Sequence, residues 1–184
     1  MAKENKAVIT LFGATGDLAQ RKLYPSLFNL YQKGYLAEHF ALLGTSRRPV
    51  SDEEFQAMVE KSISGIDEVQ AGNAQAFAKH FFYQSHDVTK PEHYEVLKER
   101  LEKLDEQFET EGNRLFYMSM APQFFGTIAL NLKKQALLTD DGFNRLVIEK
   151  PFGRDFASAK ALNDELSQTF KEDQIFRIDH YLGK

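Results

Sequence analysis

Short apolar runs alternate with longer amphipathic stretches along the whole chain. The runs are rich in β-branched and aromatic residues, which favour strands, and they lie at residues 7–13, 40–45, 81–85, 115–119, 146–148 and 175–178. Between them apolar residues recur at spacings of three and four, as in Leu97, Leu101 and Leu104, which is the period of an amphipathic helix. This second pattern predicts helices over residues 23–33, 52–63, 92–108, 124–137 and 157–170.

The strand-like runs are too continuously apolar to have one face in water. This indicates a parallel sheet that is covered by helices on both sides. We therefore expect an α/β fold with a doubly wound, mostly parallel six-stranded sheet of the Rossmann-like kind. No linker or internal repeat divides the sequence, so residues 1–184 are expected to form one domain.

Local signals mark where several helices begin and end. Ser51 and Glu54 predict a capping box at the start of one helix. Gly34, Gly112 and Gly142 are expected to follow helix ends, where glycine tolerates the left-handed conformation. Residues 64–72 are ambiguous, and we interpret them as a loop between two helices.

The composition excludes several classes of protein. The chain has 184 residues, with 23 Lys and Arg against 27 Asp and Glu, and a net charge of −4. This acidic balance argues against a nucleic-acid partner. No run reaches the roughly 20 apolar residues of a membrane helix, and no signal-peptide pattern is present, so no membrane partner is expected. The absence of Cys excludes disulfides and thiol chemistry and is compatible with a cytoplasmic protein.

The first strand is followed by a glycine-containing turn, GATGDLA at residues 13–19, and then by a helix. In such a turn the glycines let the backbone approach a pyrophosphate, which the free N–H groups at the helix N-terminus stabilise. The pattern departs from G-x-G-x-x-G, because Thr15 and Ala19 replace the second and third glycines. The alternative is a tight turn without a ligand, but its place after the first strand of an α/β chain favours a dinucleotide site.

The second strand ends in the sequence GTSRR at residues 44–48. An acidic residue here would bind the ribose hydroxyls of NAD, whereas arginine pairs with the extra phosphate of NADP. No carboxylate occurs before Asp52, which lies in the first turn of the next predicted helix. The pattern favours NADP, with Arg47 as the phosphate ligand. Two solvated surface arginines are the alternative, and NAD remains compatible with the pattern.

Polar groups also follow the fifth and sixth predicted strands. Lys150 precedes a proline at the end of the fifth strand, from where its ammonium could bind a substrate hydroxyl or orient a nicotinamide. After the sixth strand, His180, Tyr181 and Lys184 could bind a phosphate while Asp179 orients a proton-transferring partner. The alternatives are a surface turn for Lys150 and a structural pair for the Asp and His. The remaining histidines have no metal-ligand spacing and are interpreted as surface or packing residues, so no metal site is expected.

Five motifs, in this order along the chain, resemble those of one known family. They read GATGDLAQRKLYPSLFNLY, GTSRR, FYMSMAPQFF, VIEKPFG and RIDHYLGK. Together they are similar to the amino-terminal coenzyme domain of the glucose-6-phosphate dehydrogenase family. Members of that family oxidise C1 of glucose 6-phosphate to the lactone, the first step of the pentose phosphate pathway, and pass a hydride to NADP or sometimes NAD.

The resemblance implies a role for each site residue. On the cofactor side, the residues expected to hold the pyrophosphate are Gly13, Thr15, Gly16, Asp17 and Leu18. Arg47 would bind the ribose phosphate, and Asp87 and Val88 would line the adenosine side. On the substrate side, Lys150 would touch both substrate and nicotinamide. Lys22 would add positive potential, and Asp179 would orient the general base. The residues expected to bind the sugar phosphate are His180, Tyr181 and Lys184.

The general base is where the sequence departs from the family. In the family this histidine lies downstream, in a large β+α domain that also forms the dimer interface, and none of the five histidines here matches it. The resemblance thus implies a fragment of a longer, homodimeric or larger enzyme. We expect it to bind cofactor weakly, to turn over almost no substrate and to self-associate. A dehydrogenase for another sugar or hydroxy acid, or a non-catalytic NADP-binding sensor, are the alternatives.

Overall fold

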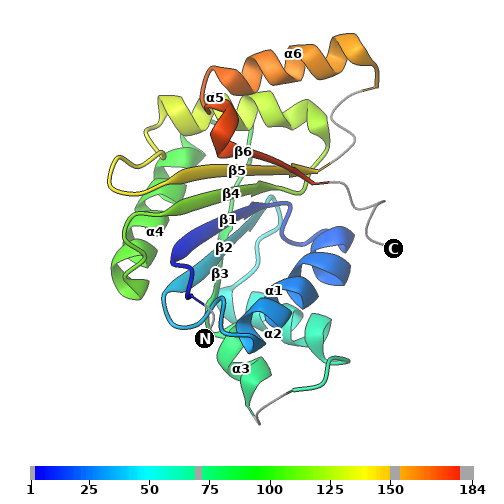
Figure 1. Ribbon diagram of the computed structural model, residues 1–184, viewed down its shortest axis with the longest axis vertical. Helices are drawn as coiled ribbons and strands as arrows, with labels where there is room; N and C mark the ends of the chain where they lie inside the picture. Colours follow the sequence, from blue (N-terminus) through cyan, green and yellow to red (C-terminus); the bar gives the residue numbers. More distant parts are fainter. Residues whose placement is uncertain (1–2, 69–71, 150–153, 179–184) are drawn as a thin grey trace.

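The computed structural model describes residues 3–68, 72–149 and 154–178. Within them six strands form one parallel sheet in the order β3-β2-β1-β4-β5-β6 (Figure 1). The strands are β1 (Ala7–Phe12), β2 (Phe40–Ser46), β3 (Phe81–Ser85), β4 (Arg114–Met118), β5 (Asn144–Glu149) and β6 (Ile175–Ile178). The predicted doubly wound, Rossmann-like sheet is confirmed, with every pair of neighbouring strands parallel.

Helices connect the strands at the places that the spacing of apolar residues predicts. They are α1 (Tyr24–Gln32), α2 (Asp52–Ile63), α3 (Asn73–Ala78), α4 (His93–Phe108), α5 (Phe125–Lys134) and α6 (Phe156–Ser167). Two short 3₁₀ turns, η2 (Pro122–Phe124) and η3 (Glu172–Gln174), precede α5 and β6. No helix in the described ranges is both long enough and apolar enough to cross a membrane.

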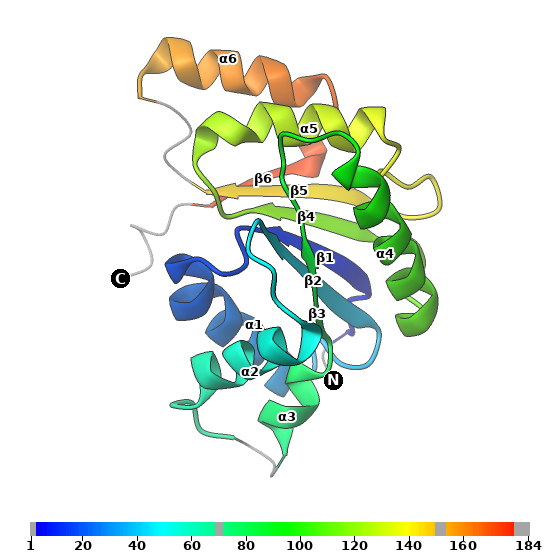
Figure 2. The ribbon, with the colours of Figure 1, turned by 180° about the vertical axis from the view of Figure 1, so that it is seen from behind.

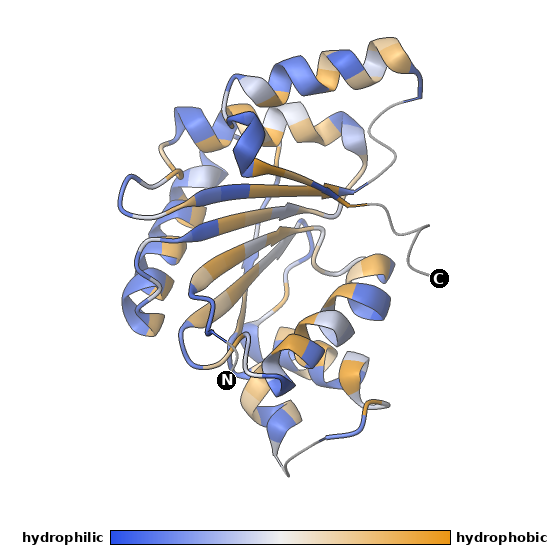
Figure 3. Ribbon diagram, viewed as in Figure 1, coloured by the Kyte–Doolittle hydropathy of each residue, from blue (hydrophilic) through white to orange (hydrophobic). Residues whose placement is uncertain are grey.

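Two hydrophobic cores lie on opposite faces of the sheet. On one face Val8, Phe12 and Phe116 pack with α4, α5 and α6. On the other face Ile9 and Leu11 pack with α1, α2 and α3. Alternate residues of β1 thus serve different cores, which explains why the whole strand is apolar. Figure 2 shows α4 and α5 over the face that is turned away in Figure 1, and Figure 3 shows the hydrophobic residues concentrated along the central strands.

The direction of winding reverses at β1, which lies between β2 and β4. The chain leaves β1 toward β2, and β4 sits on the other side, so the connections that follow β1 and β4 diverge. In open α/β sheets ligands bind at this switch point, beyond the carboxyl ends of the strands. Backbone bonds fix the spacing there, because the Ser119 N–H donates to the Phe12 carbonyl at 2.9 Å and the Gly13 N–H donates to the Thr45 carbonyl at 3.0 Å.

The first helical segment begins earlier than its apolar spacing predicts. One turn of π-helix, η1 (Ala19–Leu23), precedes α1, and the Tyr24 N–H closes it by donating to the Ala19 carbonyl. Pro25 follows directly and has no N–H to offer to the preceding turn. This π-helical turn lies beside the glycine-containing loop. Such turns are frequent at functional sites.

The capping box and one of the three predicted glycine helix ends are confirmed. The Glu54 N–H donates to Ser51 Oγ at 3.1 Å, and the Ser51 N–H donates to the Glu54 carboxylate at 3.4 Å. Gly34 follows α1 with φ +83°. Gly112 lies in the loop after α4 with φ +73°, but it is not the residue that ends the helix, and the prediction for Gly142 was wrong. Glu109 takes the left-handed conformation at the end of α4, while Gly142 lies in the loop before β5, where a Cβ atom would come within 2.4 Å of a neighbouring side-chain oxygen.

The outer part of the sheet leaves apolar surface on the face that carries α1, α2 and α3. In Figure 1 these helices lie beside β1, β2 and β3 rather than over β5 and β6. Phe176 on β6 is 46% exposed, and the Arg145 guanidinium stacks 3.9 Å from the centre of the Phe143 ring. The expectation that the chain self-associates stays a prediction.

Candidate functional site

The turn after β1 brings the backbone of β1 against that of β4. Gly13 has φ +90°, and a Cβ atom there would lie 2.0 Å from the Ser119 carbonyl oxygen. No residue with a side chain fits without moving β4. The Gly16 N–H donates back to the Gly13 carbonyl at 3.1 Å, which closes the turn. Gly13 is therefore required for the close approach of two strands, while Gly16 is exposed at the tip.

Side chains from η1 and α1 bind the carbonyl groups of this turn. The Tyr24 hydroxyl donates to the Ala14 carbonyl at 2.5 Å, and Gln20 Nε2 donates to the Thr15 carbonyl at 3.0 Å. Both carbonyls thus face the helix and not the open side of the turn. The first N–H groups of a helix have no acceptor within it, so those of Asp17 and Leu18 are oriented to bind an anion. The Asp17 carboxylate itself pairs with Arg21 at 2.6 Å.

Arg47 follows the end of β2, where it lines a cavity. Within the described ranges its guanidinium forms no ion pair, and the residue is exposed. The four arginines that pair with carboxylates in the same ranges are Arg21, Arg100, Arg114 and Arg177. Arg47 therefore presents a positive charge that is available to an anionic ligand.

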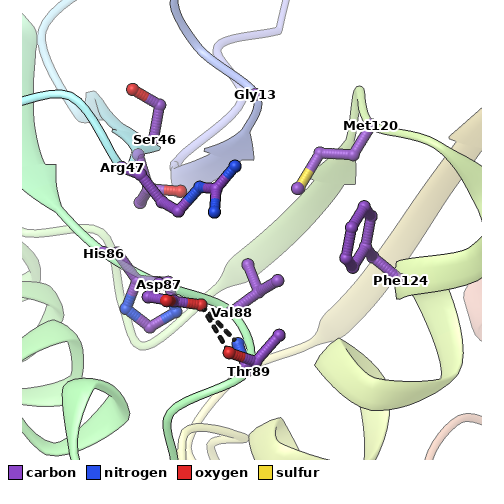
Figure 4. A pocket seen from close by; sticks show the side chains of 10 residues that line it. Gly13, Ser46, Arg47, His86, Asp87, Val88, Thr89, Met120 and Phe124 are labelled. Atoms are coloured by element: carbon purple, nitrogen blue, oxygen red, sulfur yellow. Dashed lines mark hydrogen bonds between the residues drawn. The ribbon is translucent and has the colours of Figure 1, made fainter.

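A cavity of about 230 Å³ lies at the carboxyl ends of β1, β2 and β3. It brings together four of the predicted cofactor-side residues, Gly13, Arg47, Asp87 and Val88. Figure 4 shows Arg47 on one side of the opening, Met120 and Phe124 on the other, and Val88 and Thr89 between them. Because whole ligand sites typically measure about 300–1,000 Å³, this cavity suits one end of a dinucleotide.

Asp87 is already bonded within its own turn. Its Oδ1 accepts from the Thr89 N–H at 2.9 Å and from the Thr89 hydroxyl at 2.7 Å, as drawn in Figure 4. These two bonds, with a smaller contribution from the charge of Arg47, lower the pKa of the Asp87 carboxyl. The Asp87 N–H donates to His93 Nδ1 at 3.0 Å. The loop after β3 is thus rigidly held where it meets the cavity.

His86 was interpreted from sequence as a surface or packing residue, and the structure supports packing. It is 1% exposed and lies edge-on to Tyr94, with ring centres 4.4 Å apart. Neither ring nitrogen has a hydrogen-bond partner among the described residues. Burial, reinforced by the nearby His93, lowers the pKa of His86 to about 4. The ring is therefore neutral at physiological pH and forms part of the cavity lining.

Two residues of the apolar cavity wall, and one tyrosine of β4 outside the cavity lining, were not identified from sequence. Met120 and Phe124 form an apolar wall of the cavity, and their signal was their place directly after β4. Tyr117 near the end of β4 donates its hydroxyl to Glu149 Oε1 on β5 at 2.5 Å. Burial, reinforced by Glu149, raises the pKa of Tyr117, so the phenol stays a donor. This last pair depends on the register between two strands and has no local sequence signal.

The residues present fit a dinucleotide at this edge of the sheet. The turn carbonyls are bound on the helix side, and an arginine that forms no ion pair with a described residue lines the cavity opposite an apolar wall. In contrast, no cluster of three or more metal-ligating side chains occurs in the ranges that the structure describes.

Comparison with known proteins identifies the family. Residues 10–184 match the family described as "Glucose-6-phosphate dehydrogenase, NAD binding domain". The chain belongs to the glucose-6-phosphate dehydrogenase family. The matched part is the NAD-binding domain of that family, so a nicotinamide dinucleotide is the cofactor class that the comparison supports.

Curated relatives in this family are similar over nearly the whole chain. Glucose-6-phosphate 1-dehydrogenase from Streptococcus pneumoniae is 57% identical over 180 residues, which are 98% of this chain and 36% of the relative. The enzyme of the same name from Leuconostoc mesenteroides is 54% identical over 184 residues, or 100% of this chain and 38% of the relative. The chain therefore spans little more than a third of the length of these oxidoreductases.

A solved structure of a glucose-6-phosphate dehydrogenase in complex with its substrate glucose 6-phosphate has the same fold. Its TM-score is 0.86 at 34% identity, and the match covers 100% of this chain and 39% of that one. Most of that solved chain therefore lies outside the match.

The substrate-side residues that glucose-6-phosphate dehydrogenases suggest are largely beyond the described ranges. Lys150, Asp179, His180, Tyr181 and Lys184 all lie outside them. The preceding residues Glu149 and Ile178 are partners in the register of β5 and β6. Lys22 is exposed on η1. The roles of these residues remain predictions.

Proposed function

We propose that this chain binds NADP and forms the coenzyme-binding part of an enzyme that oxidises glucose 6-phosphate to 6-phosphogluconolactone. The observation that carries the cofactor choice is the end of β2, where an exposed arginine without an ion-pair partner in the described ranges lines the cavity. A guanidinium binds phosphate through charge-assisted, often bidentate hydrogen bonds. Arg47 would therefore bind the 2′-phosphate that distinguishes NADP from NAD.

The nearest carboxylate after β2 supports the same choice. Asp52 Oδ1 accepts from the Tyr83 N–H at 2.8 Å, and its Oδ2 pairs with Arg100 at 2.6 Å. Both carboxylate oxygens are thus engaged in holding α2, α4 and β3 together. Asp52 is not available to bind ribose hydroxyls as the acidic residue of an NAD site does.

The remaining parts of the cofactor have matching surroundings. The pyrophosphate would lie over the turn, where the N–H groups of Asp17 and Leu18 and the helix dipole favour negative charge. The adenosine would enter the cavity between Val88 and the wall formed by Met120 and Phe124, with Asp87 beside it. When bound, the nicotinamide supplies the hydride acceptor.

The substrate side of the proposal comes from the resemblance and from the solved relative that holds glucose 6-phosphate. Lys150, His180, Tyr181 and Lys184 would bind the sugar phosphate, with Lys22 adding positive potential. Asp179 would orient a general base. None of the five histidines here matches the family's base by resemblance, so we expect this chain alone to bind cofactor without turnover.

Titration of the chain with NADP and NAD by calorimetry tests this proposal. Replacing Arg47 by Ala should weaken NADP binding by about 1–3 kcal/mol, or roughly 5- to 150-fold, because a charge-assisted phosphate contact is lost. NAD binding should stay within about twofold, since NAD has no 2′-phosphate to lose a contact.

Arg48→Ala is the matched control. Arg48 is the next residue and is also exposed, but it does not line the cavity. Its replacement should leave both affinities within a factor of about two, because it removes a solvated charge. Equal losses for NADP and NAD in Arg47→Ala would contradict the proposed specificity.

A further inference from the structure

The loop that carries Arg47 is held by hydroxyl groups from β3. The Tyr83 hydroxyl donates to the Arg48 carbonyl at 2.7 Å, and the Ser85 hydroxyl donates to the Arg47 carbonyl at 3.3 Å. Both carbonyl oxygens therefore face β3. If the loop had the opposite orientation, these two oxygens would repel an anion near the Arg47 guanidinium. In the observed orientation they point away from such an anion.

The hydrogen bonds around Tyr83 form a closed ring. The Arg48 N–H donates to Ser46 Oγ at 3.3 Å, and Ser46 Oγ is hydrogen-bonded to the Tyr83 hydroxyl. Because Tyr83 gives its proton to the Arg48 carbonyl, Ser46 must be the donor to Tyr83. Each hydroxyl in the ring thus donates once, and the three residues constrain one another.

The same ring reaches the turn after β1. The Thr15 hydroxyl donates to Ser46 Oγ at 3.3 Å. The proposed pyrophosphate site and the proposed 2′-phosphate site are thereby joined through one serine oxygen, which accepts from both sides.

The aromatic side chain of Tyr83 is buried and held by its neighbours. It is 3% exposed and lies 5.4 Å from the ring centre of Phe55 on α2. Its backbone N–H donates to Asp52, which pairs with Arg100. Burial raises the pKa of the phenol, so it remains a donor at neutral pH.

We propose that Tyr83 is a positioning residue that sets the preference for NADP over NAD by fixing the backbone of residues 46–48 beneath Arg47. The inference rests on the proposed function and adds a residue to it that does not touch the cofactor. The Arg47 side chain has no ion pair within the described ranges to orient it. Its direction is therefore set by the backbone that Tyr83 and Ser85 hold.

The test is Tyr83→Phe, which keeps the aromatic side chain and removes only its hydroxyl. The probes are NADP, NAD, adenosine 2′,5′-bisphosphate and AMP, each titrated by calorimetry. The variant loses two hydrogen bonds, the one donated to the Arg48 carbonyl and the one accepted from Ser46. This loss should weaken NADP and the bisphosphate about five- to tenfold. NAD and AMP, which lack the 2′-phosphate, should change less than about twofold. The unfolding midpoint is measured in parallel.

Tyr24→Phe is the matched control. It also removes a buried tyrosine hydroxyl from a backbone carbonyl, but at the turn after β1. Any loss there should be the same for NADP and NAD, because both carry the pyrophosphate. Ser46→Ala opens the hydrogen-bonded ring from its other side and also removes the acceptor of the Thr15 hydroxyl. It should therefore lower NADP affinity more than NAD affinity, with any loss common to both cofactors attributed to the bond with Thr15. It keeps the inference testable if Tyr83→Phe does not fold.

A double-mutant cycle separates positioning from general stability. If Tyr83 acts through Arg47, Tyr83→Phe should have no further effect on NADP binding in the Arg47→Ala background. Additive losses would overturn the inference, as would equal losses for NADP and NAD or an unchanged preference in Tyr83→Phe. A wild-type chain that does not prefer NADP, with no effect of Arg47→Ala, would instead overturn the proposed function and the inference with it.

Discussion

Two arginines at opposite ends of the parallel strands have opposite surroundings. We call the side of the sheet where the strands begin the amino edge and the side where they end the carboxyl edge. Arg114 begins β4 at the amino edge, is 6% exposed, and pairs with Asp105 at 2.7 Å. It also donates to the Leu137 carbonyl. Arg47 follows β2 at the carboxyl edge, is exposed, and has no ion pair in the described ranges. The same side chain is a structural link at one edge and a candidate ligand-binding group at the other, depending on whether the fold supplies its counter-charge.

The hollows at the two edges differ in the same way. The hollow at the amino edge, about 590 Å³, is larger than the cavity of about 230 Å³ at the carboxyl edge. Its lining includes the acidic residues Glu102, Asp105, Glu106, Glu111, Asp140 and Asp141. A dinucleotide phosphate would be repelled there. Charge and strand direction, and not volume, therefore mark the candidate site.

The largest expected effect is at the amino edge. Asp105→Ala should lower the free energy of unfolding by about 3–5 kcal/mol, because it leaves Arg114 buried without its counter-charge. Urea denaturation measures this loss. Cofactor affinity of the folded protein should not change, since the site lies at the opposite edge. An affinity loss as large as that of Arg47→Ala would contradict the view that the amino edge has only a structural role.

The next effect is a pH dependence from His86. Its folded pKa of about 4 lies below the ordinary value of 6.5, so between these pH values only the unfolded chain takes up the proton. The free energy of unfolding should therefore fall as pH drops from about 6.5 to about 4, by up to about 3 kcal/mol from this group. Denaturation at a series of pH values measures the slope.

His86→Phe is the matched variant, since it keeps an aromatic ring against Tyr94 and removes the titrating group. It should be less sensitive to acid in this window than the wild type, while His80, whose pKa burial also lowers, contributes equally to both. Parallel curves for the two proteins would show that His86 is not the source of the slope.

The smallest effect tests a polar group at the carboxyl edge that has a structural role. Ser51→Ala removes the helix cap and should cost about 1 kcal/mol of stability. NADP and NAD affinities should be unchanged, because Ser51 does not line the cavity. Ser51→Asp, which can still cap the helix, should restore most of the loss. A selective loss of NADP affinity in Ser51→Ala would show that the cap, too, shapes the Arg47 loop.

Sequence predicted the elements of the fold well, because each signal is local. The bounds predicted for α2 agree with the structure, since Ser51 and Glu54 mark its start and buried residues follow at helical spacing. The wide turn of η1 was missed because it depends on how Tyr24 and Pro25 meet the glycine turn in space. Glu109 replaced glycine as the left-handed residue after α4, which no residue preference indicates.

Site residues could be predicted only where a motif or family resemblance names them. Arg47 and Asp87 follow strands directly, and both line the cavity. Tyr83 and Tyr117 act across neighbouring strands, where the register decides which hydroxyl meets which partner. Parallel strands are joined by long crossover connections, so no tight turn fixes their register locally. Hydroxyl networks between strands are therefore the part of such a site that is hardest to predict from sequence.

Gly13 also joins the two walls of the cavity. Gly13 packs against the backbone of Ser119, and the next residue, Met120, lies on the opposite wall of the cavity. A bulkier residue at Gly13 would act as a wedge between β1 and β4 and would displace that wall as well as the turn. Redesign of the opening for a larger nucleotide analogue should therefore begin at Met120 or Phe124, where side chains can be trimmed without separating the strands.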